Sequence, residues 1–134
     1  MLDFSGLNWL AILVATVASF VLGGFWYGRL FGKAWLAAIS KTEEDLKPIP
    51  APFIISFFTA LITAIVLAMF IQALDIASLS AGIKVGLLIG IGFIATAMAS
   101  DSAFCGWGLK LWSIQAGYRV VYSVIMGMIL AGWQ

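Results

Sequence analysis

The chain has 134 residues, of which 63% are hydrophobic and only 10% are charged. A soluble domain carries about 25% charged residues, so this composition excludes a water-soluble globule and makes lipid the solvent. The net charge of +1, with basic residues dispersed along the chain, gives no sign of nucleic-acid binding. One cysteine and no histidine exclude an internal disulfide, histidine-ligated haem and metal sites built on His or paired Cys.

The first predicted element is a membrane-spanning helix over residues 7–27. The run contains no charged residue, and at 1.5 Å per residue it covers about 31 Å, close to a bilayer core of about 30 Å. Trp9 at one end and Trp26 and Tyr27 at the other suit the two membrane interfaces. Because no basic region precedes this run, we expect an uncleaved span rather than a signal peptide.

Residues 28–50 form the one sizeable segment outside the predicted spans. Phe31, Trp35 and Ile39 recur every four residues, which predicts an amphipathic helix lying in the headgroup plane with Trp35 as an interfacial anchor. Thr42 precedes three acidic residues and fits the N-cap of a second short helix. Three prolines then alternate along the chain: Pro48, Pro50 and Pro52. They predict an extended segment before the next span, with Pro52 in the first turn of that span.

Three more spans are predicted over residues 52–74, 80–104 and 111–133, the last ending at the interfacial Trp133. Short turns join them, so consecutive helices should be antiparallel neighbours. The predicted fold is all-α: one integral membrane domain over residues 1–134, with four transmembrane helices in an up-down bundle and an interfacial helix between the first two. The first connection contains the basic residues Arg29, Lys33, Lys41 and Lys47, and the third contains Lys110. Because basic residues in short loops favour the cytoplasmic side, both termini are predicted to face outside.

Small residues recur at four-residue spacing in every span. Such faces allow two backbones to approach closely, which is how helices associate in lipid. A glycine inside a helix costs about 1 kcal/mol relative to alanine, so glycines at this spacing indicate packing: Gly82, Gly86, Gly90 and Gly127. The alternative is that small residues are merely abundant. The sequence leaves open whether these faces pack within one chain or between protomers.

Three ionisable residues fall within the predicted spans. Lys84 lies about one turn from the end of its helix and can extend to the headgroups. Asp101 and Arg119 each lie nine residues from Lys110, so in an antiparallel pair we expect them at similar depth. Polar residues at helical spacing extend this pair into one predicted intramembrane cluster: Ser100, Asp101, Gln115, Tyr118, Arg119 and Tyr122.

Two interpretations of this cluster remain. An intramembrane ionisable residue is by default a functional candidate, here for a proton, an ion or a polar solute. The alternative is a structural clasp, in which one Asp101–Arg119 ion pair fixes the register of the last two helices. The clasp is the simpler interpretation, because neither member of such a pair is left free as an acid or a base.

Several segments together resemble a known family: Asn8-Trp9, Gly23 to Tyr27, Phe31 to Trp35, Gly117-Tyr118, Met126-Gly127 and Gly132-Trp133. The chain is similar over nearly its whole length to the domain of unknown function 1761 family of small four-helix bacterial membrane proteins. The resemblance implies four spans in a bacterial cytoplasmic membrane and no known activity. In the family pattern an Asn or Asp often precedes the Gly-Tyr pair and a His often follows it. Gln115 and Arg119 stand there in this chain, which argues against proton handling.

Two hypotheses about function follow. The first is a non-catalytic accessory or scaffold subunit that forms a homo-oligomer or packs with other membrane subunits in the lipid bilayer. The alternative is an oligomeric channel or transporter for a small ion or polar solute. No nucleophile is paired with a base, so we expect no enzyme activity and no cofactor. Cys105 is most simply a small apolar filler.

Overall fold

The computed structural model describes residues 2–46 and 49–133. Every regular element in these residues is helical. The α-helices are α1 (Trp9–Phe25), α2 (Gly32–Ala38), α3 (Pro50–Ala73), α4 (Leu79–Ile89), α5 (Thr96–Cys105) and α6 (Leu109–Gly132). The π-helical turn η1 (Trp26–Leu30) continues α1, and a second π-helical turn, η3 (Gly90–Ala95), joins α4 to α5. The element η2 (Glu43–Asp45) is a short 3-10 turn.

Four helices are long and apolar enough to cross a membrane, which confirms the number of spans predicted from the sequence. They cover Trp9–Leu30, Pro50–Ala73, Leu79–Cys105 and Leu109–Gly132. The third span begins one residue earlier and the second begins two residues earlier than predicted. Pro50 rather than Pro52 opens the second span, where its fixed φ suits the first helical position. The chain therefore has the character of a multi-pass membrane protein.

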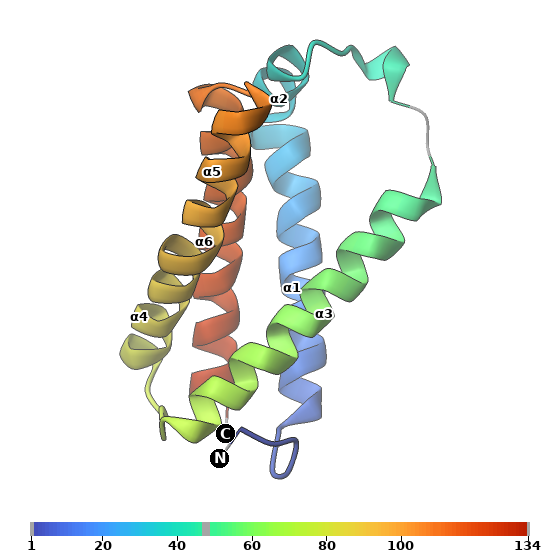
Figure 1. Cartoon of the computed structure of the whole chain (residues 1–134). Coiled ribbons are helices and arrows are strands. Elements are labelled where there is room, and N and C mark those ends of the chain that lie inside the picture. Colours follow the sequence, from blue (N-terminus) through green and yellow to red (C-terminus); the bar gives the residue numbers. More distant parts are fainter. Residues whose placement is uncertain (1, 47–48, 134) are drawn as a thin grey trace.

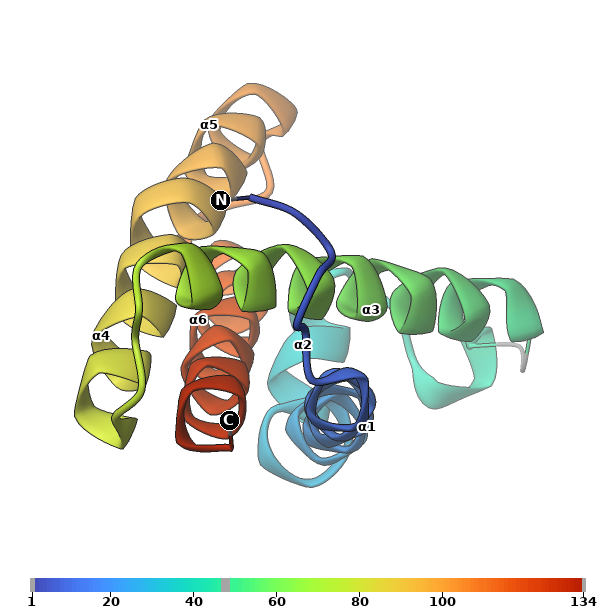
Figure 2. The same cartoon turned by 90° about the horizontal axis from the view of Figure 1, so that it is seen from below.

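Helix α6 lies at the centre of the structure. Successive spans alternate in direction (Figure 1), and α6 packs against α4, α1 and α3. Figure 2 shows α6 between α4 and α1, with α3 crossing them obliquely. Helices α3 and α4 are consecutive in the chain, yet α4 packs on α6 instead of α3. The expectation that all consecutive helices are neighbours is therefore wrong at this point, because the tilt of α3 carries it across α1 and α6.

The hydrophobic core lies at the end of the bundle near Asn8 and Trp133. It combines the start of α1 with the last turns of α3 and α6, mostly through small residues: Ala11, Ile12, Ala15, Ala60, Ala64, Leu67, Ala68, Ile71, Met126, Leu130 and Ala131. Toward the other end α3 diverges from its neighbours (Figure 1), and residues 49–56 are all exposed. In that half of the bundle polar and aromatic side chains are buried beside aliphatic ones such as Leu111 and Ile114.

The glycines of α4 and η3 lie directly against the backbone of α6. A Cβ atom added to Gly82 would overlap the carbonyl oxygen of Gly127, and one added to Gly90 would lie 2.9 Å from the Cα of Val120. Gly82, Gly86, Gly90 and Gly127 are all buried. In this structure the glycine faces thus meet within one chain.

The connection between the first two spans contains α2 and the 3-10 turn η2. The Asp45 carboxylate accepts hydrogen bonds from the backbone N–H of Thr42 (2.9 Å) and from the Thr42 hydroxyl (3.1 Å). These bonds to the charged form hold the pKa of Asp45 below its usual value, with the backbone bond as the larger cause. The predicted contributions of Lys47 and Pro48 lie outside the described residues.

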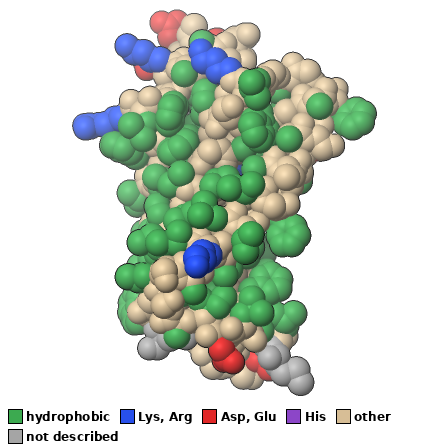
Figure 3. Space-filling model, turned by 90° about the vertical axis from the view of Figure 1, so that its left-hand side faces the viewer, with side chains coloured by type: hydrophobic (Ala, Val, Ile, Leu, Met, Phe, Trp, Pro, Cys, Tyr) green, Lys and Arg blue, Asp and Glu red, His purple; other side chains and the backbone are tan. Residues whose placement is uncertain are grey.

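The surface has the polarity expected of a chain surrounded by lipid. In Figure 3 hydrophobic side chains cover the middle of the molecule, while charged side chains gather mainly toward its two ends. Large apolar side chains on α3 are more than half exposed, including Phe53 (62%) and Ile55 (62%). Such exposure is unfavourable in water and acceptable in hydrocarbon.

Candidate functional site

The π-helical turn η3 rotates the face that α5 presents to α6. Three turns of an uninterrupted α-helix take about eleven residues, so Asp101 would share the inward face of Gly90. A π turn uses one more residue, and the buried positions run instead through Gly90, Ala95 and Ser102. Asp101 and Ser100 are consequently exposed on the outer side of α5.

The depth of Asp101 also differs from that of Arg119. Helix α5 ends at Cys105 and α6 begins at Leu109, so the hairpin turns before Lys110. Asp101 lies four residues from the end of α5 and Arg119 lies ten residues from the start of α6, which separates them in depth by about 9 Å. The predicted Asp101–Arg119 pairing is therefore wrong: both residues are described, and no ion pair joins them.

Arg119 is instead held by two tyrosines of its own helix. Its Nη1 donates a hydrogen bond of 3.3 Å to the Tyr122 hydroxyl. The guanidinium carbon lies 5.3 Å from the centre of the Tyr118 ring and 5.4 Å from that of Tyr122, within the range of cation–π attraction. Arg119 is half-buried, and three turns of helix separate it from the nearer end of the span. The structure thus brings Tyr118, Arg119 and Tyr122 together, and these three residues form the arginine–tyrosine cluster.

An aromatic cluster fixes the position of Tyr118. The Tyr118 hydroxyl donates a hydrogen bond of 2.9 Å to the carbonyl oxygen of Ser19 on α1, and its ring packs on Tyr27 at 5.5 Å and Tyr122 at 5.1 Å. Trp26 donates from Nε1 to the Ile114 carbonyl at 2.9 Å. The π turn η1 therefore directs Trp26 and Tyr27, predicted as interfacial anchors, inward onto α6.

The other predicted interfacial residues lie at the two ends of the bundle. Trp35 packs against Tyr27 with ring centres 5.1 Å apart. Trp9 and Trp133 are partly exposed at the opposite end, where the Asn8 amide donates a hydrogen bond of 3.1 Å to the Trp133 carbonyl. Lys84 is exposed on α4, and Cys105 is exposed at the end of α5.

Hydroxyl groups on α3 extend the arginine–tyrosine cluster. The Thr63 hydroxyl donates to the Thr59 carbonyl at 2.8 Å, which leaves its oxygen to accept from the Tyr122 hydroxyl at 3.5 Å. The Thr59 hydroxyl donates in turn to the Ser56 carbonyl at 3.0 Å. Sequence reasoning missed these threonines, although the spacing of Ser56, Thr59 and Thr63 on one helical face was a usable signal.

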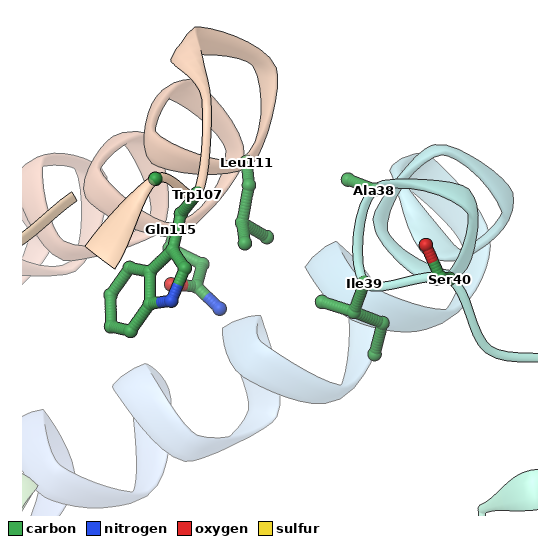
Figure 4. Close-up of a pocket in the computed structure, with 7 residues that line it drawn as sticks. Ala38, Ile39, Ser40, Trp107, Leu111 and Gln115 are labelled. Atoms are coloured by element: carbon green, nitrogen blue, oxygen red, sulfur yellow. The ribbon is translucent and has the colours of Figure 1, made fainter. Parts of the chain in front are cut away.

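A pocket of about 400 Å³ lies at the end of the bundle above this cluster. Figure 4 shows the side chains that line it, which come from the end of α2 and from the turn into α6: Ala38, Ile39, Ser40, Trp107, Leu111 and Gln115. Gln115 precedes Arg119 by one helical turn, so the two residues share a face of α6. Gln115, which the sequence placed in the polar cluster, therefore lines the pocket and lies one turn of α6 from Arg119.

Two further features of the third span, one in η3 and one in α5, could not be predicted from the sequence. Trp112 donates from its indole Nε1 to the Ala95 carbonyl at 3.0 Å, in the π turn where the α-helical bond pattern is interrupted. The hydroxyl of Ser102 is buried against α6 without a hydrogen-bond partner in the described structure. Neither residue type carries a signal in the sequence that distinguishes these contacts from ordinary packing.

Comparison with known proteins identifies the family but no relative of known activity. No curated protein matches the chain, and no solved structure matches it. The family model described as "Protein of unknown function (DUF1761)" matches residues 10–131. This range includes the whole arginine–tyrosine cluster and all four spans except their outermost residues Trp9 and Gly132. This match agrees with the resemblance noted in the sequence, and the chain belongs to the DUF1761 family of proteins of unknown function.

Proposed function

We propose that this protein is a non-catalytic accessory or scaffold subunit, which oligomerises or packs into a larger membrane complex through the outward face of α5. The observation that carries this proposal is the character of that face. Its exposed residues are mostly small or polar: Thr96, Ala97, Ala99, Ser100, Asp101 and Ala103. Phe104, near the end of the helix, is a bulky apolar exception that is 92% exposed. The exposed face of α3, by contrast, carries bulky apolar side chains such as Phe53, Ile54 and Phe58.

Small faces are the surfaces by which helices associate in lipid, because they allow close backbone approach. The face on α4 is already occupied by α6 in this chain, whereas no described element covers the outward face of α5. Asp101 adds a carboxylate to it, and a charged group within a span gains from a hydrogen-bonding partner. A second transmembrane helix would supply both the packing and the partner.

The proposed setting is a bacterial cytoplasmic membrane, with both termini outside and α2 lying in the cytoplasmic headgroup plane. Arg29, Lys33 and Lys41 belong to one connection, and Lys110 starts α6 at the same end of the bundle (Figure 1). Basic residues in short loops favour the cytoplasmic side. Labelling of a cysteine introduced at Lys41 tests this orientation, and access from the outside of intact cells would overturn it.

Native mass spectrometry of the protein released from its own membranes tests the proposed assembly. We expect a stoichiometric complex, either with itself or with other subunits. Ala99→Leu should weaken the complex because it adds bulk to the outward face of α5. Gly24→Leu is the control, since Gly24 is exposed on α1 with no neighbouring atom within 4 Å of an added Cβ. A monomer in every preparation, or equal complexes for both variants, would contradict the proposal.

The alternative proposal, an oligomeric channel or transporter for a small ion or polar solute, has one observation in its favour. Arg119 places a cation within a span, with Gln115 one turn closer to the end pocket. Ion or solute flux in proteoliposomes that is lost in Arg119→Gln would support this alternative. Tight liposomes with the folded wild-type protein would remove it.

A further inference from the structure

We propose that Arg119 is the binding residue for a small carboxylate anion, which reaches it through the end pocket past Gln115. This inference is independent of the proposed assembly through α5, which uses a different surface. It rests on an arginine without an acidic partner, on the hydrogen-bond donors left over in its fork, and on the position of the pocket.

The charge of Arg119 has no counter-charge in the described part of the chain. An arginine side chain remains protonated in proteins, so the cation cannot be removed by loss of a proton. Arg119 lies about 15 Å along α6 from its start, and a charge near the bilayer centre costs about 2.5 kcal/mol or more when uncompensated. The two tyrosine faces offset part of this cost, and an anion would offset the rest.

Most of the hydrogen-bond donors of the Arg119 guanidinium have no acceptor in the described part of the chain. Arginine carries five N–H donors in a planar fork that matches a carboxylate. The structure assigns one of them, to the Tyr122 hydroxyl at 3.3 Å. In the described part of the chain this is the one bond in which the guanidinium donates, and the Tyr118 and Thr63 hydroxyls donate elsewhere, to the carbonyls of Ser19 and Thr59. The cluster therefore orients Arg119 without using up its fork.

The end pocket lies one helical turn of α6 away from Arg119. Leu111 and Gln115 line the pocket, and Arg119 continues the same face of α6 one turn further on, about 6 Å from Gln115. In Figure 4 the Gln115 amide lies beside Trp107 at the pocket wall, where its N–H groups can pass an anion inward. A pocket of about 400 Å³ is within the size range of small-molecule sites.

The position of the pocket favours a soluble carboxylate over a lipid phosphate. The pocket is formed by the end of α2, the turn before α6 and the first turns of α6, so it lies at the end of the bundle. A headgroup phosphate would have to sink by most of the 15 Å that separates Arg119 from the start of its helix. Both sources share anionic oxygen chemistry, and the experiment below distinguishes them.

Fluorine NMR of para-fluorobenzoate tests the proposal on the full-length protein in phosphatidylcholine nanodiscs. We expect line broadening that saturates, and binding at least about tenfold weaker for para-fluorobenzamide, which has the same shape without the charge. This comparison requires no mutation. Equal binding of the acid and the amide would overturn the proposal.

Variants then locate the site. Arg119→Gln should weaken para-fluorobenzoate binding by about tenfold or more, and Arg119→Lys should retain part of it because the charge remains but the fork is lost. Lys84→Gln, which removes an exposed cation on α4, should leave binding unchanged. If Lys84→Gln weakens binding as much as Arg119→Gln does in folded protein, the assignment to Arg119 is wrong.

Nanodiscs containing phosphatidylglycerol identify the source of the anion. Benzoate binding that is insensitive to this lipid supports the soluble carboxylate. Two results would assign the site to a lipid headgroup and overturn the soluble ligand. One is displacement of benzoate by phosphatidylglycerol, and the other is phosphatidylglycerol that stays bound to the wild-type protein but not to Arg119→Gln. Binding of neither anion by folded wild-type protein would overturn the site as a whole.

Discussion

Replacing Gly86 by alanine should separate α4 from α6. A Cβ at Gly86 would overlap the carbonyl oxygen of Ser123 and lie 2.7 Å from the Cα of Val124, whereas ordinary contact begins at 3.4 Å. The helices must therefore move apart by at least about 0.7 Å, because a change of rotamer cannot relieve an overlap with backbone atoms. Overpacking of this kind costs about 1–3 kcal/mol, and the higher helix propensity of alanine returns up to about 1 kcal/mol.

The expected net loss is up to about 2 kcal/mol of unfolding free energy, and the loss relative to a glycine-to-alanine change without overlap is about 1–3 kcal/mol. It can be measured by reversible unfolding in mixed dodecyl maltoside and SDS micelles, followed by circular dichroism. Gly92→Ala is the matched control from the same span, since no atom lies within 4 Å of its added Cβ, and it should be neutral or slightly stabilising. If Gly86→Ala is as stable as Gly92→Ala, the close packing of α4 on α6 is refuted.

Three further predictions concern single hydrogen-bonding groups. Tyr118→Phe should lower the unfolding free energy by about 1 kcal/mol in the same assay, since it removes the bond to the Ser19 carbonyl; no change would show that this bond does not join α1 to α6. Ser102→Ala should be neutral or stabilising by up to about 1 kcal/mol, because the buried hydroxyl lacks a partner; a clear loss would reveal a partner. The pKa of Asp45 is lowered because its charged form accepts hydrogen bonds from Thr42. These bonds should stabilise the fold at every pH above the usual aspartate pKa, and this stabilisation should be lost as the pH falls through the lowered pKa. NMR titration should show Thr42→Val raising this pKa only in part, since the larger backbone bond remains, and an unchanged midpoint would contradict the role of the hydroxyl.

The spans and the small-residue spacing could be predicted from the sequence because both depend on local pattern. A run of about 20 apolar residues is long enough to cross a bilayer whatever its neighbours are. The four-residue spacing of Gly82, Gly86 and Gly90 marks one helical face, which in the structure lies against α6. The tilt of α3 depends on packing between distant segments, so spacing within α3 could not reveal it.

The arrangement around Asp101 could not be predicted because it depends on a change in helical period. Sequence reasoning assumed a continuous α-helix from residue 80 to 104 and a hairpin centred on Lys110. The π turn at Gly90–Ala95 and the earlier hairpin change both the face and the depth of Asp101. The grouping of Tyr118, Arg119 and Tyr122 depends only on spacing within α6, so the sequence could place those three residues on one stripe.

Cysteine accessibility at positions 101 and 102 tests the rotation of α5 most directly, and the outward position of Asp101 depends on that rotation. Asp101→Cys and Ser102→Cys would be made separately in a Cys105→Ser background and labelled with a small maleimide in detergent. The account predicts rapid labelling of Asp101→Cys and protection of Ser102→Cys, since Asp101 is exposed and Ser102 is 7% exposed. Protection of Asp101→Cys with rapid labelling of Ser102→Cys would contradict the account and return Asp101 to the face of α5 that packs on α6.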